Sequence, residues 1–184
     1  MATIIGIAGS LRKGSYNAAL LRAVAELAPV GMKVEITSVA GIPLYDGDLE
    51  SEHGIPTPVA ELKDKVATAD GLLLVTPEYN HSIPGVLKNA IDWLSRPPAD
   101  IARVFGDKPV AIMGATPGAA GTRLAQAAWL PVLRALGTRA WFGKQLYVAG
   151  AAQEFDVNGR LVDEKTKKLL SELMIGFAKF VSVR

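Results

Sequence analysis

The stretch Thr3-Ile-Ile-Gly-Ile-Ala-Gly-Ser-Leu-Arg-Lys-Gly-Ser-Tyr-Asn17 decides the fold, because it reads as a strand, a loop and the start of a helix. Residues 3–8 are apolar and mostly β-branched, which is typical of a buried strand, and Gly9 ends this run. From Asn17 to Leu27 the apolar residues recur at helical spacing. A buried strand that leads through a loop into a helix indicates an α/β fold.

The same alternation continues along the chain. Apolar runs predict further strands at 34–39, 71–76, 109–114 and around Tyr147–Val148, and helical patterns predict helices from Thr57, at 84–95, at 121–136 and at 163–181. Five apolar strands separated by helices favour one parallel sheet covered on both faces. We therefore predict a single α/β domain over residues 1–184, built as a three-layer sandwich.

Several local features carry expectations of their own. Thr57-Pro58 is typical of a helix cap followed by a first-turn proline, and Pro131 must kink or restart its helix. The 40–56 connection is long, so it is either mobile or part of a binding surface. The apolar face of 84–95 is wider than a usual core stripe, so either its spare part, which ends in Trp93, packs on a second subunit or the whole helix is deeply buried.

Composition excludes several classes of protein. The 184 residues include no cysteine, which excludes disulfides, thiolate metal sites and cysteine nucleophiles, and with two histidines no metal site is expected. A net charge of +2 gives no sign of a nucleic-acid groove or a polybasic membrane patch. The N-terminus lacks a signal-peptide pattern, and no apolar run is long enough for a spanning helix. We expect a cytoplasmic protein with neither nucleic acid nor membrane as a partner.

Three loops should meet at the carboxyl edge of the sheet, where ligands bind in folds of this kind. They span residues 9–17, 77–85 and 115–121 and are rich in Gly, Ser, Thr or Pro. None of them combines a nucleophile, a base and an orienting group. We therefore assign no catalytic side chain.

The 9–17 loop has the character of a phosphate site. It leads into a helix N-terminus, where free N–H groups and the helix dipole attract anions. Ser10 and Ser15 add hydroxyl donors, and Arg12 adds a forked cation. Ser15 stands where a nucleoside-triphosphate loop requires lysine, and G-x-G-x-x-G is absent, so a single terminal phosphate is favoured. The alternative is a plain glycine turn with Ser15 or Asn17 as the helix cap.

The 77–85 loop is restricted by two prolines, which holds its backbone donors and acceptors ready for the edge of a flat heterocycle. Tyr79 is suited to stacking on such a ring. Glu78 either takes part in recognising this ring or is a solvated loop carboxylate. His81 is an acid, a substrate contact or simply exposed, and Ser82 either contributes to the loop or caps the next helix.

Three motifs together resemble the NAD(P)H-dependent FMN reductase family. They are GSLRKGSYN at 9–17, PEYN at 77–80 and PGVLKNAIDW at 84–93, and the resemblance covers nearly the whole chain. It implies a flavodoxin-like fold with a five-stranded parallel sheet in the order 2-1-3-4-5. It also implies FMN as the cofactor and NAD(P)H as the co-substrate.

The resemblance further implies which residues contact FMN. The phosphate would be held by Ser10, Arg12, Ser15 and Asn17, and the ring would be edged by Pro77, Glu78, Tyr79 and Asn80. Thr116 and Gly118 would close on the other side of the flavin, unless 116–121 is only a glycine-rich turn.

In such a family, hydride would pass from NAD(P)H through flavin N5 to a quinone, a flavin, an azo dye or chromate by a ping-pong scheme. One alternative is a flavodoxin-type electron carrier, although such carriers are usually strongly acidic and this chain is not. Another is a non-enzymatic FMN-binding domain. The resemblance also implies a homodimer or homotetramer.

Overall fold

The computed structural model describes residues 1–183. Its strands are β1 (Ala2–Ala8), β2 (Met32–Thr37), β3 (Gly71–Val75), β4 (Pro109–Ala115), β5 (Arg139–Ala140) and β6 (Tyr147–Val148). Its helices are α1 (Tyr16–Glu26), α2 (Gly47–His53), α3 (Thr57–Thr68), α4 (Gly85–Leu94), α5 (Ile101–Phe105), α6 (Arg123–Ala135), α7 (Ala151–Glu154) and α8 (Glu164–Ser182), with a 3-10 turn at Pro98–Asp100. No helix within this range has the length and apolar character needed to cross a membrane.

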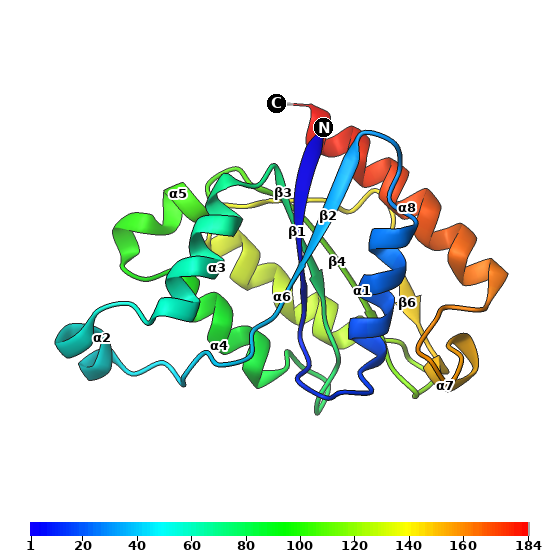
Figure 1. The fold of residues 1–184 in the computed structure, drawn as a ribbon, viewed down its shortest axis with the longest axis horizontal. Coiled ribbons are helices and arrows are strands. Elements are labelled where there is room, and N and C mark those ends of the chain that lie inside the picture. Colours follow the sequence, from blue (N-terminus) through cyan, green and yellow to red (C-terminus); the bar gives the residue numbers. More distant parts are fainter. Residues whose placement is uncertain (184) are drawn as a thin grey trace.

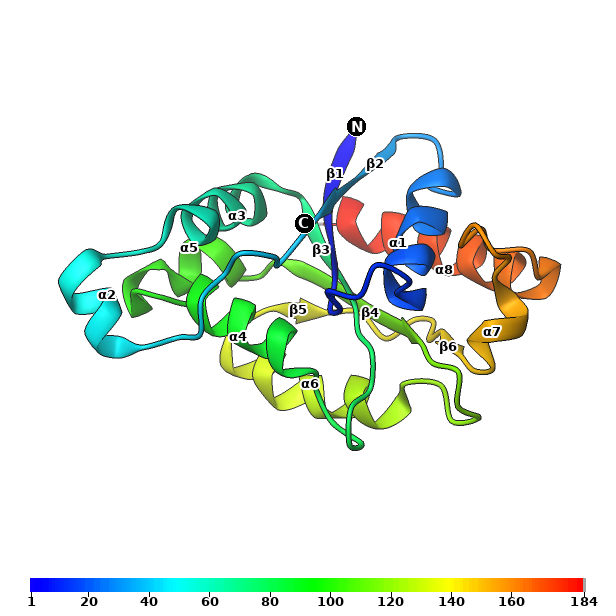
Figure 2. The ribbon, with the colours of Figure 1, turned by 60° about the horizontal axis from the view of Figure 1, so that its bottom comes forward.

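The strands form one parallel sheet in the order β2-β1-β3-β4-β5, with β6 also paired to β4 (Figure 1). This is the flavodoxin-like order, so the predicted fold class is confirmed. Because β1 and β3 are neighbours at the centre, the loops that follow them lie next to each other at one edge of the sheet (Figure 2).

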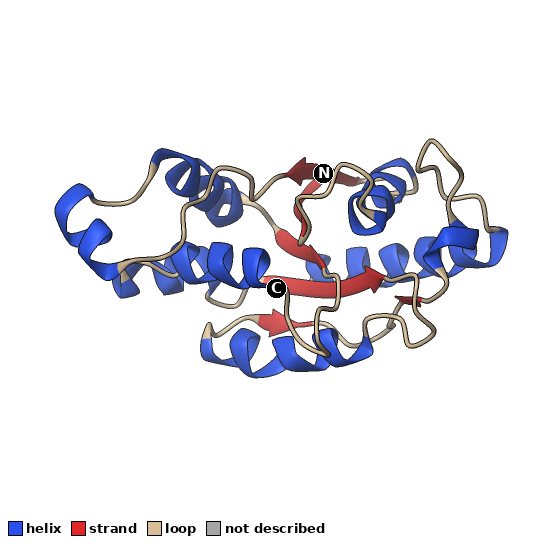
Figure 3. Cartoon of the chain, turned by 90° about the horizontal axis from the view of Figure 1, so that it is seen from below, coloured by secondary structure: helices blue, strands red, loops and turns tan. Residues whose placement is uncertain are grey.

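Helices cover both faces of the sheet (Figure 3). Leu73 and Val75 of β3 pack in the layer that contains α1 and α8, whereas Leu72 and Leu74 pack in the layer of α3, α4, α5 and α6. Successive strand residues point to opposite faces, so a strand buried on both sides is apolar throughout. That is why β3 was visible in the sequence as an unbroken apolar run.

The predicted fifth strand is present only in two short pieces. Ala140 of β5 pairs with Val110, and Tyr147 of β6 pairs with Gly114, so both pieces extend the same edge of β4. Between them residues 141–146 leave the sheet, and the Trp141 ring packs against Phe177 of α8 with 5.7 Å between ring centroids. The expectation of one strand around Tyr147–Val148 therefore described only half of this edge.

The 40–56 connection contains a helix of its own, α2, and is fastened to α4. The Pro43 carbonyl accepts hydrogen bonds from Trp93 Nε1 at 2.9 Å and from Asn89 Nδ2 at 2.8 Å. The Tyr45 ring meets the Trp93 ring edge-on, at 4.9 Å between centroids. Trp93 is fully buried by this chain, so Trp93 itself does not pack on a second subunit, whereas Val86 on the same apolar face is exposed.

An ion pair holds α2 in place. Glu50 Oε2 accepts from Arg96 Nε at 2.8 Å and from the Tyr45 hydroxyl at 3.0 Å. The hydrogen bond from Arg96 lowers the pKa of the Glu50 carboxyl, since the cation favours the ionised form. The long connection is thus a structured strap over α4.

Two helix details differ from expectation. Thr57 is the first residue of α3 and Pro56 occupies the cap, so the predicted Thr57 cap is wrong. Pro131 lies inside α6, which continues through it and does not restart. Pro131 cannot donate a hydrogen bond to the Ala127 carbonyl, and both residues are exposed on the solvent side of the helix, where the missing bond costs least.

Candidate functional site

The three predicted loops meet in one pocket at the carboxyl edge of the sheet, at the bottom of Figure 1. The residues that line it come from all three loops: Ser10, Arg12, Ser15, Tyr16, Asn17, Pro77, Glu78, Tyr79, Ala115, Thr116 and Pro117. Asn80 and Gly118 lie in the same loops but outside this lining. The tertiary structure therefore brings together eight of the ten predicted cofactor residues.

The first loop presents donors that have no partner in the part of the chain that the structure describes. Ser15 is the cap of α1, because its Oγ accepts from the Ala18 N–H at 3.2 Å. Within residues 1–183, the N–H groups of Ser10, Tyr16 and Asn17 donate to no other group, and the exposed Arg12 forms no ion pair. Free amides, a hydroxyl and a free guanidinium suit a phosphate dianion.

Asn17 joins the first and third loops. Its side chain is buried, with Nδ2 donating to the Ala115 carbonyl at 2.8 Å and Oδ1 accepting from the Ala115 N–H at 2.9 Å. One amide hydrogen remains for a ligand. Besides the predicted phosphate contact, Asn17 therefore fixes α1 to the end of β4, which the sequence reading missed.

The second loop is a tight hairpin. Tyr79 and Ser82 exchange backbone hydrogen bonds of 3.2 and 3.0 Å, and Asn80 and His81 between them have φ angles of 50° and 61°. Two successive positive φ angles are the mark of a type I′ turn, and Asn and His tolerate them better than most residues. Asn80 and His81 therefore sit at the exposed tip. Ser82 does not cap α4, whose cap is Pro84.

Glu78 is not the solvated carboxylate of the alternative interpretation. Its side chain is 10% exposed, and Oε2 accepts from the N–H groups of Leu124 at 2.9 Å and Ala125 at 3.0 Å. These amides belong to the first turn of α6, whose own cap residue, Thr122, makes no capping side-chain bond. Glu78 thus caps α6 from a distant loop and meets its positive dipole end.

A second tie holds the same loop to α6. Trp129 Nε1 donates to Thr76 Oγ1 at 3.2 Å, and Thr76 Oγ1 in turn donates to the Pro77 carbonyl at 2.9 Å. Gly9 allows the first and second loops to touch, since a Cβ there would lie 2.9 Å from Pro77 Cδ. Contacts within the chain therefore hold the first and second loops in place around the pocket.

The third loop is fastened to the end of the sheet edge. Thr116 donates through its N–H to Val148 and accepts at its carbonyl from Ala151, at 2.9 and 3.0 Å. The Gly118 carbonyl accepts from the Gly150 N–H at 3.1 Å. Among residues 1–183, no group of three or more His, Asp or Glu side chains is placed to hold a metal ion.

The chain is similar to known proteins over most of its length. Residues 2–153 match the family model described as NADPH-dependent FMN reductase. The chain is 43% identical to an NAD(P)H-dependent FMN reductase of Pseudomonas aeruginosa, over 92% of this chain and 89% of that protein. It is 41% identical to a 2-hydroxy-1,4-benzoquinone reductase of a Burkholderia species, over 97% and 95%.

A solved structure is similar in its fold. The flavoenzyme NAD(P)H:(acceptor) oxidoreductase of Paracoccus denitrificans superimposes with a TM-score of 0.88 at 34% identity, covering 98% of this chain and 97% of that one. The family match, the identities and the shared architecture all extend over most of the chain. The chain therefore belongs to the NADPH-dependent FMN reductase family, and it is an oxidoreductase that works with FMN and NAD(P)H.

Proposed function

We propose that this enzyme oxidises NAD(P)H and reduces a small quinone, with FMN held in the three-loop pocket. The observation that carries the proposal is the set of free donors in the first loop, facing a second loop already fixed in place. Relatives named as quinone reductases support the acceptor class. Flavins, azo dyes and chromate are further proposed acceptors. We also propose a single domain that works as a cytoplasmic homodimer or homotetramer.

The residues present fit FMN. Ser10, Arg12, Ser15 and Asn17 would hold its phosphate, and Pro77, Glu78, Tyr79 and Thr116 would flank its ring. Asn80 and Gly118 would contact only those parts of FMN that extend beyond the lined pocket. Bound FMN supplies the two-electron chemistry. The protein binds and orients the reactants.

The lining offers no free carboxylate and no imidazole. It includes neither histidine, and the Glu78 carboxylate already accepts two backbone hydrogen bonds. We propose that NAD(P)H and the acceptor bind in turn at the same opening of the pocket, in a ping-pong scheme without a ternary complex. Family membership favours this reductase over an electron carrier.

The phosphate assignment is tested with Arg12→Ala. Loss of a hydrogen bond to a charged group costs about 1.5–3 kcal/mol, so we expect FMN to bind about 10- to 150-fold more weakly. Riboflavin lacks the phosphate, so its affinity should stay unchanged. Flavin fluorescence titration measures both. Lys13→Ala is the matched control, because Lys13 is an adjacent exposed cation outside the pocket lining. Equal losses in the two variants, or an equal loss for riboflavin, would disprove the assignment.

The kinetic scheme and His81 are tested together. Initial rates against NAD(P)H at several quinone concentrations should give parallel double-reciprocal lines.

His81 lies at the exposed tip, outside the lining, so His81→Ala should change the apparent KM for quinone and leave FMN affinity unchanged. His53→Ala, in α2, is the control. Intersecting lines would indicate a ternary complex, and flavin loss in His81→Ala would place that residue in the cofactor site.

A further inference from the structure

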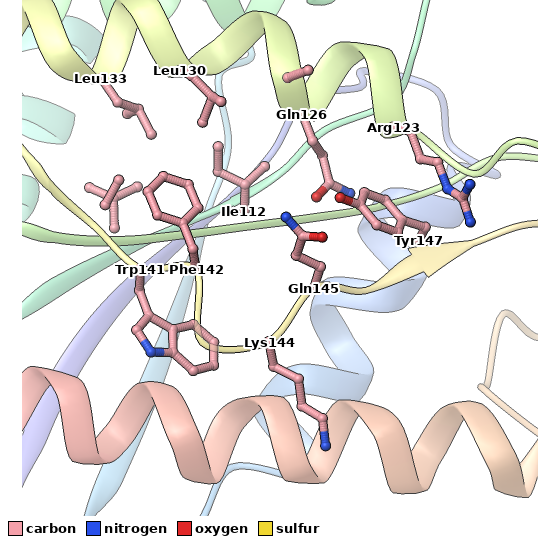
Figure 4. Close-up of a pocket in the computed structure, with 13 residues that line it drawn as sticks. Ile112, Arg123, Gln126, Leu130, Leu133, Trp141, Phe142, Lys144, Gln145 and Tyr147 are labelled. Atoms are coloured by element: carbon pink, nitrogen blue, oxygen red, sulfur yellow. The ribbon is translucent and has the colours of Figure 1, made fainter.

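A second pocket lies where the sheet edge is interrupted between β5 and β6 (Figure 4). It has a volume of about 120 Å³ and lies between α6, β4 and the 141–146 segment. It shares no lining residue with the three-loop pocket. It is therefore a separate site, and the proposed reaction does not use it.

Its floor carries an unpaired stretch of strand. Along β4, Met113 accepts from Thr76 on the β3 side, whereas Val110 accepts from Trp141 on the β5 side. Since strand groups alternate sides, the N–H and C=O of Ile112 face the β5 side. There the pairing jumps from Val110 to Gly114, and within residues 1–183 Ile112 has no partner on this edge. Ile112 is also the one residue of β4 that is not fully buried.

Gln126 adds a fixed acceptor to the wall. Its side chain is 7% exposed, and Nε2 donates to Thr122 Oγ1 and to the Leu146 carbonyl, both at 3.0 Å. These two bonds fix the orientation of the amide. Its Oε1 accepts no hydrogen bond within the described chain, and Figure 4 shows it turned toward the space beside Phe142 and Ile112. Because the residue is largely buried while this oxygen is accessible from the pocket, a ligand bound there can donate a hydrogen bond to it.

Much of the remaining wall is apolar, and the side chains of Arg123, Lys144, Gln145 and Tyr147 also line the pocket. Leu130, Leu133 and Phe142 point into the same space as Ile112 (Figure 4). An enclosed apolar cavity of about 150 Å³ accommodates benzene, and this pocket of about 120 Å³ is somewhat smaller but open to solvent, so the largest group it suits is a single ring with few substituents. A ring that also carries a hydrogen-bond donor matches both the walls and Gln126.

We propose that this pocket binds single-ring phenols, with the ring against Leu130, Leu133 and Phe142 and the hydroxyl donating to Gln126 Oε1. The Ile112 N–H is the donor available to the phenolic oxygen. Hydroquinones belong to this chemical class, so the site takes compounds of the kind that quinone reduction releases. Binding itself does not depend on the proposed function.

The test is a titration of ¹⁵N-labelled, FMN-saturated protein with phenol and with toluene, which has a similar ring but no hydroxyl. The Ile112 amide and the Gln126 side-chain amide should shift and saturate with phenol. Phenol should bind about tenfold more tightly than toluene, the value of one hydrogen bond. Ala127→Leu, which adds bulk to the lining, should abolish the shifts. Ala135→Leu on the same helix, outside the lining, should preserve them.

Four outcomes would overturn the proposal. They are shifts confined to the three-loop pocket, equal affinities for phenol and toluene, the absence of saturable shifts, and survival of the shifts in Ala127→Leu. Shifts at Ile112 that depend on protein concentration without phenol would assign the pocket to a second copy of the chain. Because the readout is binding, its failure is distinguishable from a failure to turn over NAD(P)H.

Discussion

Gly114→Ala should lower the free energy of unfolding by about 3 kcal/mol, at the upper end of the usual cost of overpacking. A Cβ at this position would overlap the Thr76 carbonyl oxygen and Thr122 Oγ1. The first is backbone of the neighbouring strand and cannot rotate away. Urea unfolding without added flavin measures the loss free of any contribution from ligand binding.

The displaced Thr76 would also move Pro77, since Thr76 Oγ1 holds the Pro77 carbonyl. FMN affinity should therefore fall in the same variant. Gly85→Ala is the matched control, because a Cβ at Gly85 meets no atom within 4 Å and should change stability by less than about 0.5 kcal/mol. If Gly114→Ala were as stable as Gly85→Ala, the close approach of β3 and β4 described here would be wrong.

Glu78→Ala should lower the free energy of unfolding by about 2 kcal/mol and weaken FMN binding about tenfold. The stability loss arises because the Leu124 and Ala125 amides lose a charged acceptor at the N-terminus of α6. The affinity loss arises because the second loop is no longer anchored at that point. Glu78→Gln keeps an acceptor oxygen but not the charge, so both losses should be about half as large.

Asp46→Ala serves as the control for this experiment. Asp46 also caps a helix with its carboxylate, through the Asp48 N–H of α2, but it lies outside the three-loop pocket. Its loss should leave FMN affinity unchanged. Unchanged FMN affinity in Glu78→Ala, measured by fluorescence titration, would show that the pocket does not depend on this cap.

The alternation of strands and helices could be predicted because each element shows its own pattern of apolar residues within a short stretch of sequence. A parallel strand such as β3 is buried on both faces, so it must be apolar at every position, and Gly71–Val75 is visible without any tertiary information. The loop chemistry is equally local, since a helix N-terminus preceded by Ser10, Arg12 and Ser15 has the donors that suit a phosphate wherever the rest of the chain lies. The strand order came from the family resemblance.

The edge of the sheet was harder to predict. β5 and β6 have two residues each, which is too short for any periodic pattern, and their pairing with β4 defines them. The sequence likewise left open what covers Trp93, because a helix has the same wide apolar face whether it packs on a second subunit or on another segment of its own chain. Only the fold shows that Pro43 and Tyr45 cover it.

By itself, the sequence determined the α/β class, the three loops and the type of ligand they suit, because backbone preference and side-chain chemistry act over a few residues. The tertiary structure alone decided what Asn17 and Glu78 do. Asn17 bonds a residue 98 positions away, and Glu78 bonds amides 46 and 47 positions away. A buried polar group takes whichever partner the packing of the chain brings within hydrogen-bond distance, and no local spacing encodes that choice.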